Sequence, residues 1–205
     1  MDIITIDGLS ASGKSSVARE IARRLGVPYV SSGLLYRGVA YLGLHAGIPL
    51  DDENWLIELL SSYPLELLPL PEGNRLLARG EDITPHLHSA EIDLGSSRIA
   101  RHPRIRAYVN DRLRQLPPPF VAEGRDMGSQ VFPEAAYKFY LTAQPEVRAH
   151  RRAFQQRRDE QAVMKELLER DAVDAPQSAP APEAIILDTS SLTLEEVVER
   201  ILRAL

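Results

Sequence analysis

The sequence predicts an α/β protein, in which a parallel sheet is flanked by helices in three layers. Two observations support this prediction. Short apolar stretches that suit buried strands alternate with longer segments of helical periodicity along most of the chain. In addition, a glycine-rich segment joins the first apolar stretch to the first helical segment, which is where α/β proteins commonly bind phosphate. We therefore expect a single domain, residues 1–205, with five parallel strands.

The composition is that of a globular chain, with 44% hydrophobic and 26% charged residues among 205. The absence of cysteine excludes disulfides and thiolate metal sites. The apolar start Ile3–Ile6 is far too short for a signal peptide or a membrane span, so we expect a cytoplasmic protein. The net charge of −5 argues against a general binder of nucleic acids or membranes, and we expect a monomer that binds small molecules.

Arginine is distributed unevenly, and the only lysines are Lys14, Lys138 and Lys165. Most of the arginines are expected on solvated helix faces. In an acidic protein with a phosphate-binding loop, however, clusters of arginine are also suited to bind phosphates through paired hydrogen bonds. The clusters are Arg98, Arg101, Arg104, Arg106, Arg112 and Arg114, and then Arg148, Arg151, Arg152, Arg157 and Arg158.

Residues 8–15 match the phosphate-binding P-loop pattern G-x-x-x-x-G-K-[ST] at all four fixed positions. Glycine at both fixed positions lets successive backbone N–H groups point at phosphate oxygens. Lys14 would reach the β- and γ-phosphates of a nucleotide, and the Ser15 hydroxyl would supply a ligand to Mg²⁺. A glycine-rich turn without a ligand is the alternative. The strand before the loop and the amphipathic helix after it, which ends at Gly26, favour the nucleotide.

The next segment predicts a second strand at 28–30 and a helix that begins at 31–33 and ends at Gly47. Tyr36 and Arg37 fall in the first turns of this helix, where exposed N–H groups favour an anion. From the helix alone, packing of Tyr36 and solvation of Arg37 is an equally good interpretation.

Residues 63–84 predict a small β insertion. The segments 65–68 and 75–78 flank the turn 71–74, which is a hairpin signal. Residues 80–82 are then expected to turn the chain again. No chemistry can be assigned to this insertion from its residues.

Helices are predicted on both sides of the insertion. Asp51 is expected to cap a third helix, and Thr84–Pro85 to start another helical stretch, because Thr suits a cap and Pro the first helical position. Two helices follow, roughly at 89–101 and 103–115. They are separated at His102–Pro103, because proline disfavours the helical conformation in the residue before it.

The strand 120–122 ends in Glu123, Gly124, Arg125 and Asp126. In open α/β sheets, ligands bind outside the carboxyl ends of the strands, and Arg125 and Asp126 would project there. A charged surface turn is the alternative.

The last third continues the alternation. An arginine-rich helix from Pro145 to Arg158 and a second helix at about 161–171 precede a proline-rich connection, and residues 145–182 together suggest a lid. Thr193 and Glu196 form a capping box before the final helix. The remaining strands are expected at 137–142 and 185–187.

Several motifs occur at the separations of one known family. They are Ile6-Asp7-Gly8 through Lys14-Ser15-Ser16, Ser32-Gly33-Leu34-Leu35-Tyr36-Arg37, Pro103-Arg104-Ile105-Arg106, Gly124-Arg125-Asp126-Met127-Gly128, Val131-Phe132-Pro133, Arg148-Ala149-His150-Arg151-Arg152, and Glu169-Arg170-Asp171 with Asp174. In these motifs the sequence resembles the bacterial cytidylate kinases, within the nucleoside monophosphate kinase group of P-loop proteins. The resemblance covers nearly the whole chain. It implies the three-layer P-loop kinase fold, and transfer of the γ-phosphoryl group of ATP to CMP or dCMP, which gives CDP or dCDP and ADP.

The resemblance also implies roles for individual residues. Lys14, Arg125 and Arg152 would be catalytic, and Ser15 would hold Mg²⁺ through ATP. Arg148 and Arg151 would join Arg152 in a mobile clamp on the phosphates. ATP would be bound by Gly8, Leu9, Ser10, Ala11, Ser12, Gly13, Lys14, Ser15 and Ser16. CMP would be bound by Ser32, Tyr36, Arg37, Ser97, Arg106, Arg125, Asp126, Arg170 and Asp174.

Within this set, Arg37 and Arg125 would hold the acceptor phosphate, and Ser97, Arg106 and Asp126 would recognise the base. A carboxylate can accept a hydrogen bond from the N4 amino group of cytosine, and the arginine and serine can meet its O2 and N3 acceptors. Uracil reverses this edge.

Three positions depart from the family pattern. Ser31 stands where many members of the family have an acidic residue, and Glu123 stands where several have aspartate. Gln177 stands where the family commonly has an arginine. The last change puts one phosphate or ribose contact in doubt.

Two alternatives remain. A kinase for another small molecule, such as AMP, UMP, dTMP or shikimate, would share the P-loop but differ in the acceptor site. A GTPase-like switch would need a guanine-reading Asn-Lys-x-Asp element, and the sequence has none.

Overall fold

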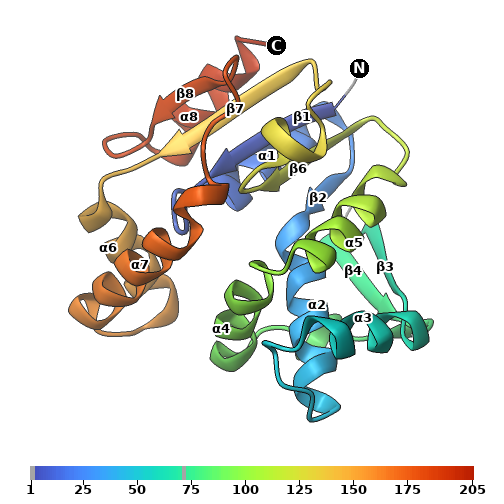
Figure 1. Ribbon diagram of the computed structural model, residues 1–205. Coiled ribbons are helices and arrows are strands. Elements are labelled where there is room, and N and C mark those ends of the chain that lie inside the picture. Colours follow the sequence, from blue (N-terminus) through green and yellow to red (C-terminus); the bar gives the residue numbers. More distant parts are fainter. Residues whose placement is uncertain (1–2, 71–72) are drawn as a thin grey trace. The chain divides into compact units, whose positions relative to one another are not determined.

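The computed structural model describes residues 3–70 and 73–205, apart from the side chains of Val173 and Gln177 (Figure 1). The chain divides into two compact units. One contains Met1–Pro28 and Pro118–Leu205, and the other contains Tyr29–Pro117. Within the described ranges, no helix has both the length and the apolar character that crossing a bilayer requires.

The parallel sheet has the strand order β2-β6-β1-β7-β8. Its strands β1, β6, β7 and β8 belong to the first unit, whereas β2 (Tyr29–Ser31) belongs to the second. The central strand β1 pairs with β6 and with β7, so that Ile4 lies between Val121 and Tyr137. Helix α1 contacts β1 and β6 of this sheet and packs against α8. The predicted α/β fold is thus confirmed. The elements of the first unit are β1 (Ile3–Gly8), α1 (Lys14–Leu25), β6 (Phe120–Gly124), the π-helical turn η2 (Met127–Val131), β7 (Tyr137–Thr142), α6 (Pro145–Gln156), α7 (Glu160–Asp174), the 3-10 turn η3 (Ala175–Gln177), β8 (Ile185–Asp188) and α8 (Leu194–Leu202).

Helices α6 and α7 lie side by side as a hairpin (Figure 1). A small apolar core joins them. Ala149 and Ala153 of α6 pack against Val163 and Leu167 of α7, and all four side chains are buried. Ala11 of the glycine-rich loop packs against the same cluster. The hairpin therefore lies next to the loop that the sequence identifies as a phosphate site.

The second unit is organised around α2 (Ser32–His45), which contacts α3, α4, α5 and the strand β4. Glycine at position 38 allows α2 to approach β4 closely, because a Cβ there would lie 2.3 Å from the side chain of Leu76. The predicted hairpin is confirmed as part of an antiparallel sheet of order β3-β4-β5, although Pro71 and Glu72 of its turn lie outside the described residues. The other elements are α3 (Glu53–Ser62), β3 (Leu65–Leu70), β4 (Gly73–Ala78), β5 (Glu81–Asp82), the 3-10 turn η1 (Thr84–His86), α4 (Ala90–Ile99) and α5 (Pro103–Arg114).

Two local predictions were wrong, and a third was incomplete. Asp52, not Asp51, caps α3, because its carboxylate accepts the N–H of Trp55 at 3.2 Å. Thr84 caps no long helix, since its hydroxyl accepts the N–H of Leu76 at 2.7 Å and only one 3-10 turn follows. Residues 80–82 do not simply turn the chain, because Glu81–Asp82 pairs with β4 as a third strand.

Candidate functional site

The glycine-rich loop runs from the end of β1 to the start of α1. Gly8 has φ +154° and Gly13 has φ +94°, a conformation that favours glycine at both positions. At Gly8 space is also lacking, since a Cβ would lie 2.3 Å from the carbonyl oxygen of Leu141 and 2.8 Å from Ser12 Oγ. Gly13 immediately precedes α1, so its backbone directs the loop into the N-terminus of that helix. The backbone is therefore shaped as the P-loop pattern predicts.

Lys14 begins α1, and its Nζ donates to the carbonyl oxygen of Leu9 at 3.2 Å. Burial, and secondly the positive charge of Arg125, lower the pKa of Lys14 to about 8 from the ordinary 10.5. Arg170 lowers this pKa further, whereas Glu123 and Asp7 oppose the effect. The site therefore concentrates positive charge that a phosphate would neutralise.

Asp7 connects the P-loop strand to the segment after β6. Its carboxylate accepts the N–H groups of Met127 and Gly128, each at 2.8 Å, and the side chain is buried. Burial, and to a smaller degree the charge of Asp126, raise the pKa of Asp7 to about 6, against the lowering effect of these two hydrogen bonds and of Lys14. Asp7 thus fixes the turn that follows Arg125 and Asp126.

Arg125 lies beyond β6 and forms an ion pair with Asp174 at the end of α7, with 2.7 Å between Nη2 and Oδ2. Arg170 approaches the same carboxylate oxygen at 3.6 Å. The other terminal nitrogen of Arg125, Nη1, is buried and has no hydrogen-bond partner among the described residues. Arg125 can therefore still donate to a bound anion.

The three arginines of α6 have different contacts. Arg148 is buried and structural, because it donates to the Ser10 carbonyl oxygen at 3.2 Å and pairs with Asp171 at 2.6 Å. Arg151 donates to the hydroxyl and the carbonyl oxygen of Thr189, at 3.0 and 2.6 Å. Only Arg152 directs its guanidinium to a side chain of the P-loop, with 2.9 Å between Nη1 and Ser10 Oγ.

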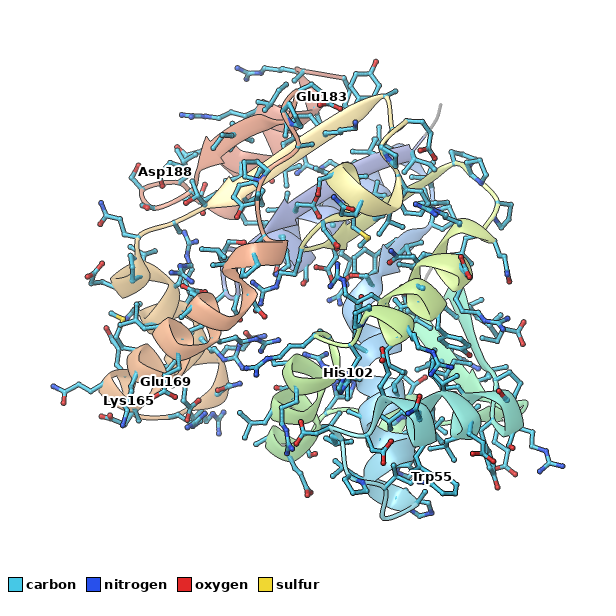
Figure 2. The ribbon with its side chains drawn as sticks, viewed as in Figure 1. Trp55, His102, Lys165, Glu169, Glu183 and Asp188 are labelled. Carbon is cyan, nitrogen blue, oxygen red and sulfur yellow. The ribbon has the colours of Figure 1, made fainter. Side chains whose placement is uncertain are left out.

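Thr189 supports the P-loop from the far end of the chain. It follows Asp188, which Figure 2 labels at the end of β8. Its hydroxyl lies 3.2 Å from the carbonyl oxygen of Ser12 and 3.1 Å from that of Thr142. One buried side chain thus joins the P-loop to the end of β7.

The second unit holds the other predicted substrate residues. Ser32, Tyr36 and Arg37 lie in the first turns of α2, as the sequence predicts. The Nε of Arg37 pairs with Asp93 of α4 at 2.9 Å. Ser97 is half-buried on α4, and Arg106 of α5 donates to the carbonyl oxygen of Ala100 at 3.3 Å.

Comparison with known proteins identifies the family. The family model described as Cytidylate kinase matches residues 4–205. A cytidylate kinase of Thermus thermophilus is 60% identical over 98% of this chain and 96% of its own length. The chain belongs to the cytidylate kinase family. A cytidylate kinase of Deinococcus deserti, 57% identical over 96% of this chain and 95% of its own length, agrees with this assignment. The resemblance drawn from the motifs is thereby confirmed.

Solved structures of other kinases share the fold of this chain. A shikimate kinase from Bacteroides thetaiotaomicron has a TM-score of 0.52 at 13% identity, over 99% of this chain and 97% of its own. A gluconokinase from Sinorhizobium meliloti has a TM-score of 0.52 at 19% identity, over 98% and 90%. At these identities the likeness shows the P-loop kinase fold alone.

The structural roles of Asp7, Thr189 and Arg148 were not predicted from the sequence. For Asp7 the sequence contained one indication, because an acidic residue stands at the end of a buried strand directly before the P-loop. Thr189 gave none, because it is 177 residues away from its partner Ser12. The side chain of Gln177, the departure from the family arginine, lies outside the described residues.

The residues present fit a nucleotide-bound Mg²⁺. Such an ion is typically held by few protein groups together with phosphate oxygens and water. The hydroxyl of Ser15 belongs to an exposed residue in the first turn of α1, directly after Lys14, and suits this role. Among residues 3–70 and 73–205, no three His, Asp or Glu side chains gather as a metal site.

Proposed function

We propose that this chain transfers the γ-phosphoryl group of ATP to CMP or dCMP and releases ADP with CDP or dCDP. The match to cytidylate kinases over nearly the whole chain carries this proposal. The phosphate-binding loop and the arginines near it supply what the reaction requires, which is alignment of two phosphates and neutralisation of the charge that develops between them.

Residues 8–16 bind the phosphates of ATP through the backbone of the loop. Lys14 and Arg152 carry positive charge to the transferring phosphoryl group, and the hydrogen bond of Arg152 to Ser10 supports its place beside the loop. When bound, Mg²⁺ would be held by Ser15 and phosphate oxygens and would neutralise part of the same charge. An oxygen of the CMP phosphate attacks the γ-phosphorus, and the bond to the oxygen shared with the β-phosphorus breaks. No covalent intermediate with the enzyme is needed.

Arg37 and Arg125 bind the phosphate of CMP, with Ser32 and Tyr36 close to Arg37. The unsatisfied Nη1 of Arg125 supports this role, because a buried guanidinium nitrogen without a partner is costly until it donates a hydrogen bond. Arg170 and Asp174 serve as contacts to the sugar and within the lid. Asp174 pairs with both Arg125 and Arg170, which supports one polar cluster on the acceptor side.

Asp126, Arg106 and Ser97 select the base. The carboxylate of Asp126 accepts from the N4 amino group of cytosine, whereas uracil presents a carbonyl oxygen at that position. We expect Asp126→Asn, whose amide can also donate, to narrow the ratio of kcat/KM between CMP and UMP by about tenfold. An unchanged ratio would remove Asp126 from this role.

A panel of acceptors with ATP and Mg²⁺ tests the proposed reaction. We expect rapid ADP formation with CMP and dCMP and slower turnover with UMP. If AMP or dTMP is phosphorylated faster than CMP, the acceptor assignment is wrong. Release of inorganic phosphate at the same rate with and without CMP would favour a nucleotide-dependent switch instead.

The arrangement of the chain adds two proposals. Residues 145–182, which include the α6–α7 hairpin, act as a lid, and its small separate core supports movement as one body. Residues 63–84 are an insertion in the part of the chain that binds CMP. The expectations of a monomer, of a cytoplasmic location and of no binding to nucleic acids or membranes stay predictions.

A further inference from the structure

The N-terminus of α2, next to the residues proposed to bind CMP, has no hydrogen bond from a side chain that caps the helix. Ser31 is both the last residue of β2 and the residue that precedes α2, and its hydroxyl makes no capping hydrogen bond. Ser32 follows as the first residue of α2, and Arg37 lies in the second turn. The direction in which these side chains point therefore depends on how the backbone of β2 is held.

Asn74 of the β insertion holds that backbone. Its Nδ2 donates to the carbonyl oxygen of Tyr29 at 2.7 Å, and its Oδ1 accepts the N–H of Ser31 at 2.9 Å. One amide side chain thus makes two hydrogen bonds to residues i and i+2, which is how a neighbouring strand would bind. Only Asn and Gln combine a donor and an acceptor in this way, and Asn is the shorter of the two.

The insertion contacts α2 at a second point. Gly38 lies directly after Arg37, and a Cβ there would meet Leu76 at 2.3 Å and Leu65 at 3.2 Å. Leu76 and Leu65 belong to β4 and β3 and are fully buried, so this contact leaves little freedom to slide. Asn74 itself is held in β4 opposite Pro69 of β3.

We propose that Asn74 is a positioning residue for the acceptor phosphate, and that the β insertion serves to hold the first turns of α2 in the geometry that binds CMP. This inference rests on the proposed function, in which Ser32 and Arg37 contact CMP. A backbone held in place before the substrate arrives loses less freedom on binding, so the affinity for CMP is higher than with a mobile segment.

Steady-state kinetics of Asn74→Ala test the inference. We expect the KM for CMP to rise about tenfold, because both hydrogen bonds to the segment are lost. The KM for ATP and kcat are expected to change by about twofold or less, since the hydrogen bonds of the Asn74 side chain are made to the backbone of Tyr29 and Ser31. Asn74→Asp, which keeps the size and the acceptor but cannot donate to Tyr29, is expected to raise the same KM and serves if the alanine variant does not fold.

The matched control is Asn54→Ala. Asn54 is also an asparagine of this unit, and its Oδ1 accepts a hydrogen bond from Arg104 Nη1 at 2.6 Å. It lies on α3, away in sequence from β2 and the start of α2. Its removal is expected to leave the KM for CMP unchanged. Backbone hydrogen exchange provides a second readout, because the Ser31 N–H should exchange faster in Asn74→Ala than in the wild type. An equal rise of KM in Asn54→Ala, or unchanged Ser31 exchange, would overturn the inference.

Arg37→Ala separates this inference from the function on which it rests. If Arg37→Ala raises the KM for CMP and the Asn74 variants do not, the positioning role is wrong and the acceptor site stands. If Arg37→Ala also leaves this KM unchanged, the proposed acceptor site itself is wrong.

Discussion

Replacement of Lys14 by methionine should make the unliganded enzyme more stable while it removes activity. Burial and Arg125 lower the pKa of Lys14 from 10.5 to about 8. Each pKa unit corresponds to about 1.4 kcal/mol, so keeping Lys14 protonated in the folded chain costs up to about 3 kcal/mol. The side chain is still partly accessible, and methionine loses the hydrogen bond to Leu9, so we expect a net gain of about 1–2 kcal/mol.

The pH dependence follows from the same values. Below pH 8 Lys14 is protonated in the folded and the unfolded chain, and its full penalty is present. Between pH 8 and 10.5 the folded chain has released this proton while the unfolded chain still holds it, so wild-type stability rises with pH from this group. The advantage of Lys14→Met should therefore be largest at pH 7 and shrink towards pH 10.

Urea unfolding of both proteins at pH 7, 9 and 10, without nucleotide, measures this effect. Lys165→Met is the control, because Lys165 is an exposed lysine on α7 (Figure 2) and its replacement should change stability by less than about 0.5 kcal/mol. The activity of Lys14→Met should fall by at least about 100-fold. A Lys14→Met enzyme that is no more stable than the wild type at pH 7 would refute the reasoning, as would an advantage that does not depend on pH.

Two further predictions concern the loop and the arginines of α6. Gly8→Ala should lower the free energy of unfolding by about 3 kcal/mol or more, because its Cβ would meet the backbone oxygen of Leu141, and thermal unfolding of the unliganded protein measures this. Arg152→Ala should lower kcat about 100-fold and leave the melting temperature nearly unchanged. Arg151→Ala should instead leave kcat within about threefold of the wild type. It should lower the free energy of unfolding by about 1 kcal/mol, because Arg151 donates hydrogen bonds to Thr189. Equal kcat values for the two variants would contradict the distinction between them.

Most of the fold could be predicted from the sequence because its signals are local. Apolar runs marked the strands, and the capping box of Thr193 and Glu196 marked the start of α8 correctly. The errors were local as well. Asp51 and Asp52 are adjacent and chemically identical, and only the hydrogen bond to Trp55 shows which of them caps α3. The prediction that Thr84 caps a helix failed because its hydroxyl instead accepts the N–H of Leu76, which lies on strand β4.

The candidate site could be predicted only where one segment carries its own chemistry. The P-loop does so, because its glycines and Lys14 are contiguous. The supports of the site could not be predicted from periodicity, since each joins segments far apart in the chain. Asp7 binds residues 120 and 121 positions away, and Asn74 binds backbone 43 and 45 positions away. Periodicity tells which face of an element is buried but not which element covers it.

The bond between Asp7 and the turn at Met127–Gly128 has an evolutionary consequence. Beyond the pairing of β1 with β6, one carboxylate joins the strand that leads to the P-loop to the turn after Arg125 and Asp126. Under the proposed function, exchange of Asp126 is expected to change base preference while the P-loop stays intact. A mutation of Asp7 would be pleiotropic, since it would disturb both substrates at once, and descendants with new acceptors should be found among changes at the former position rather than the latter.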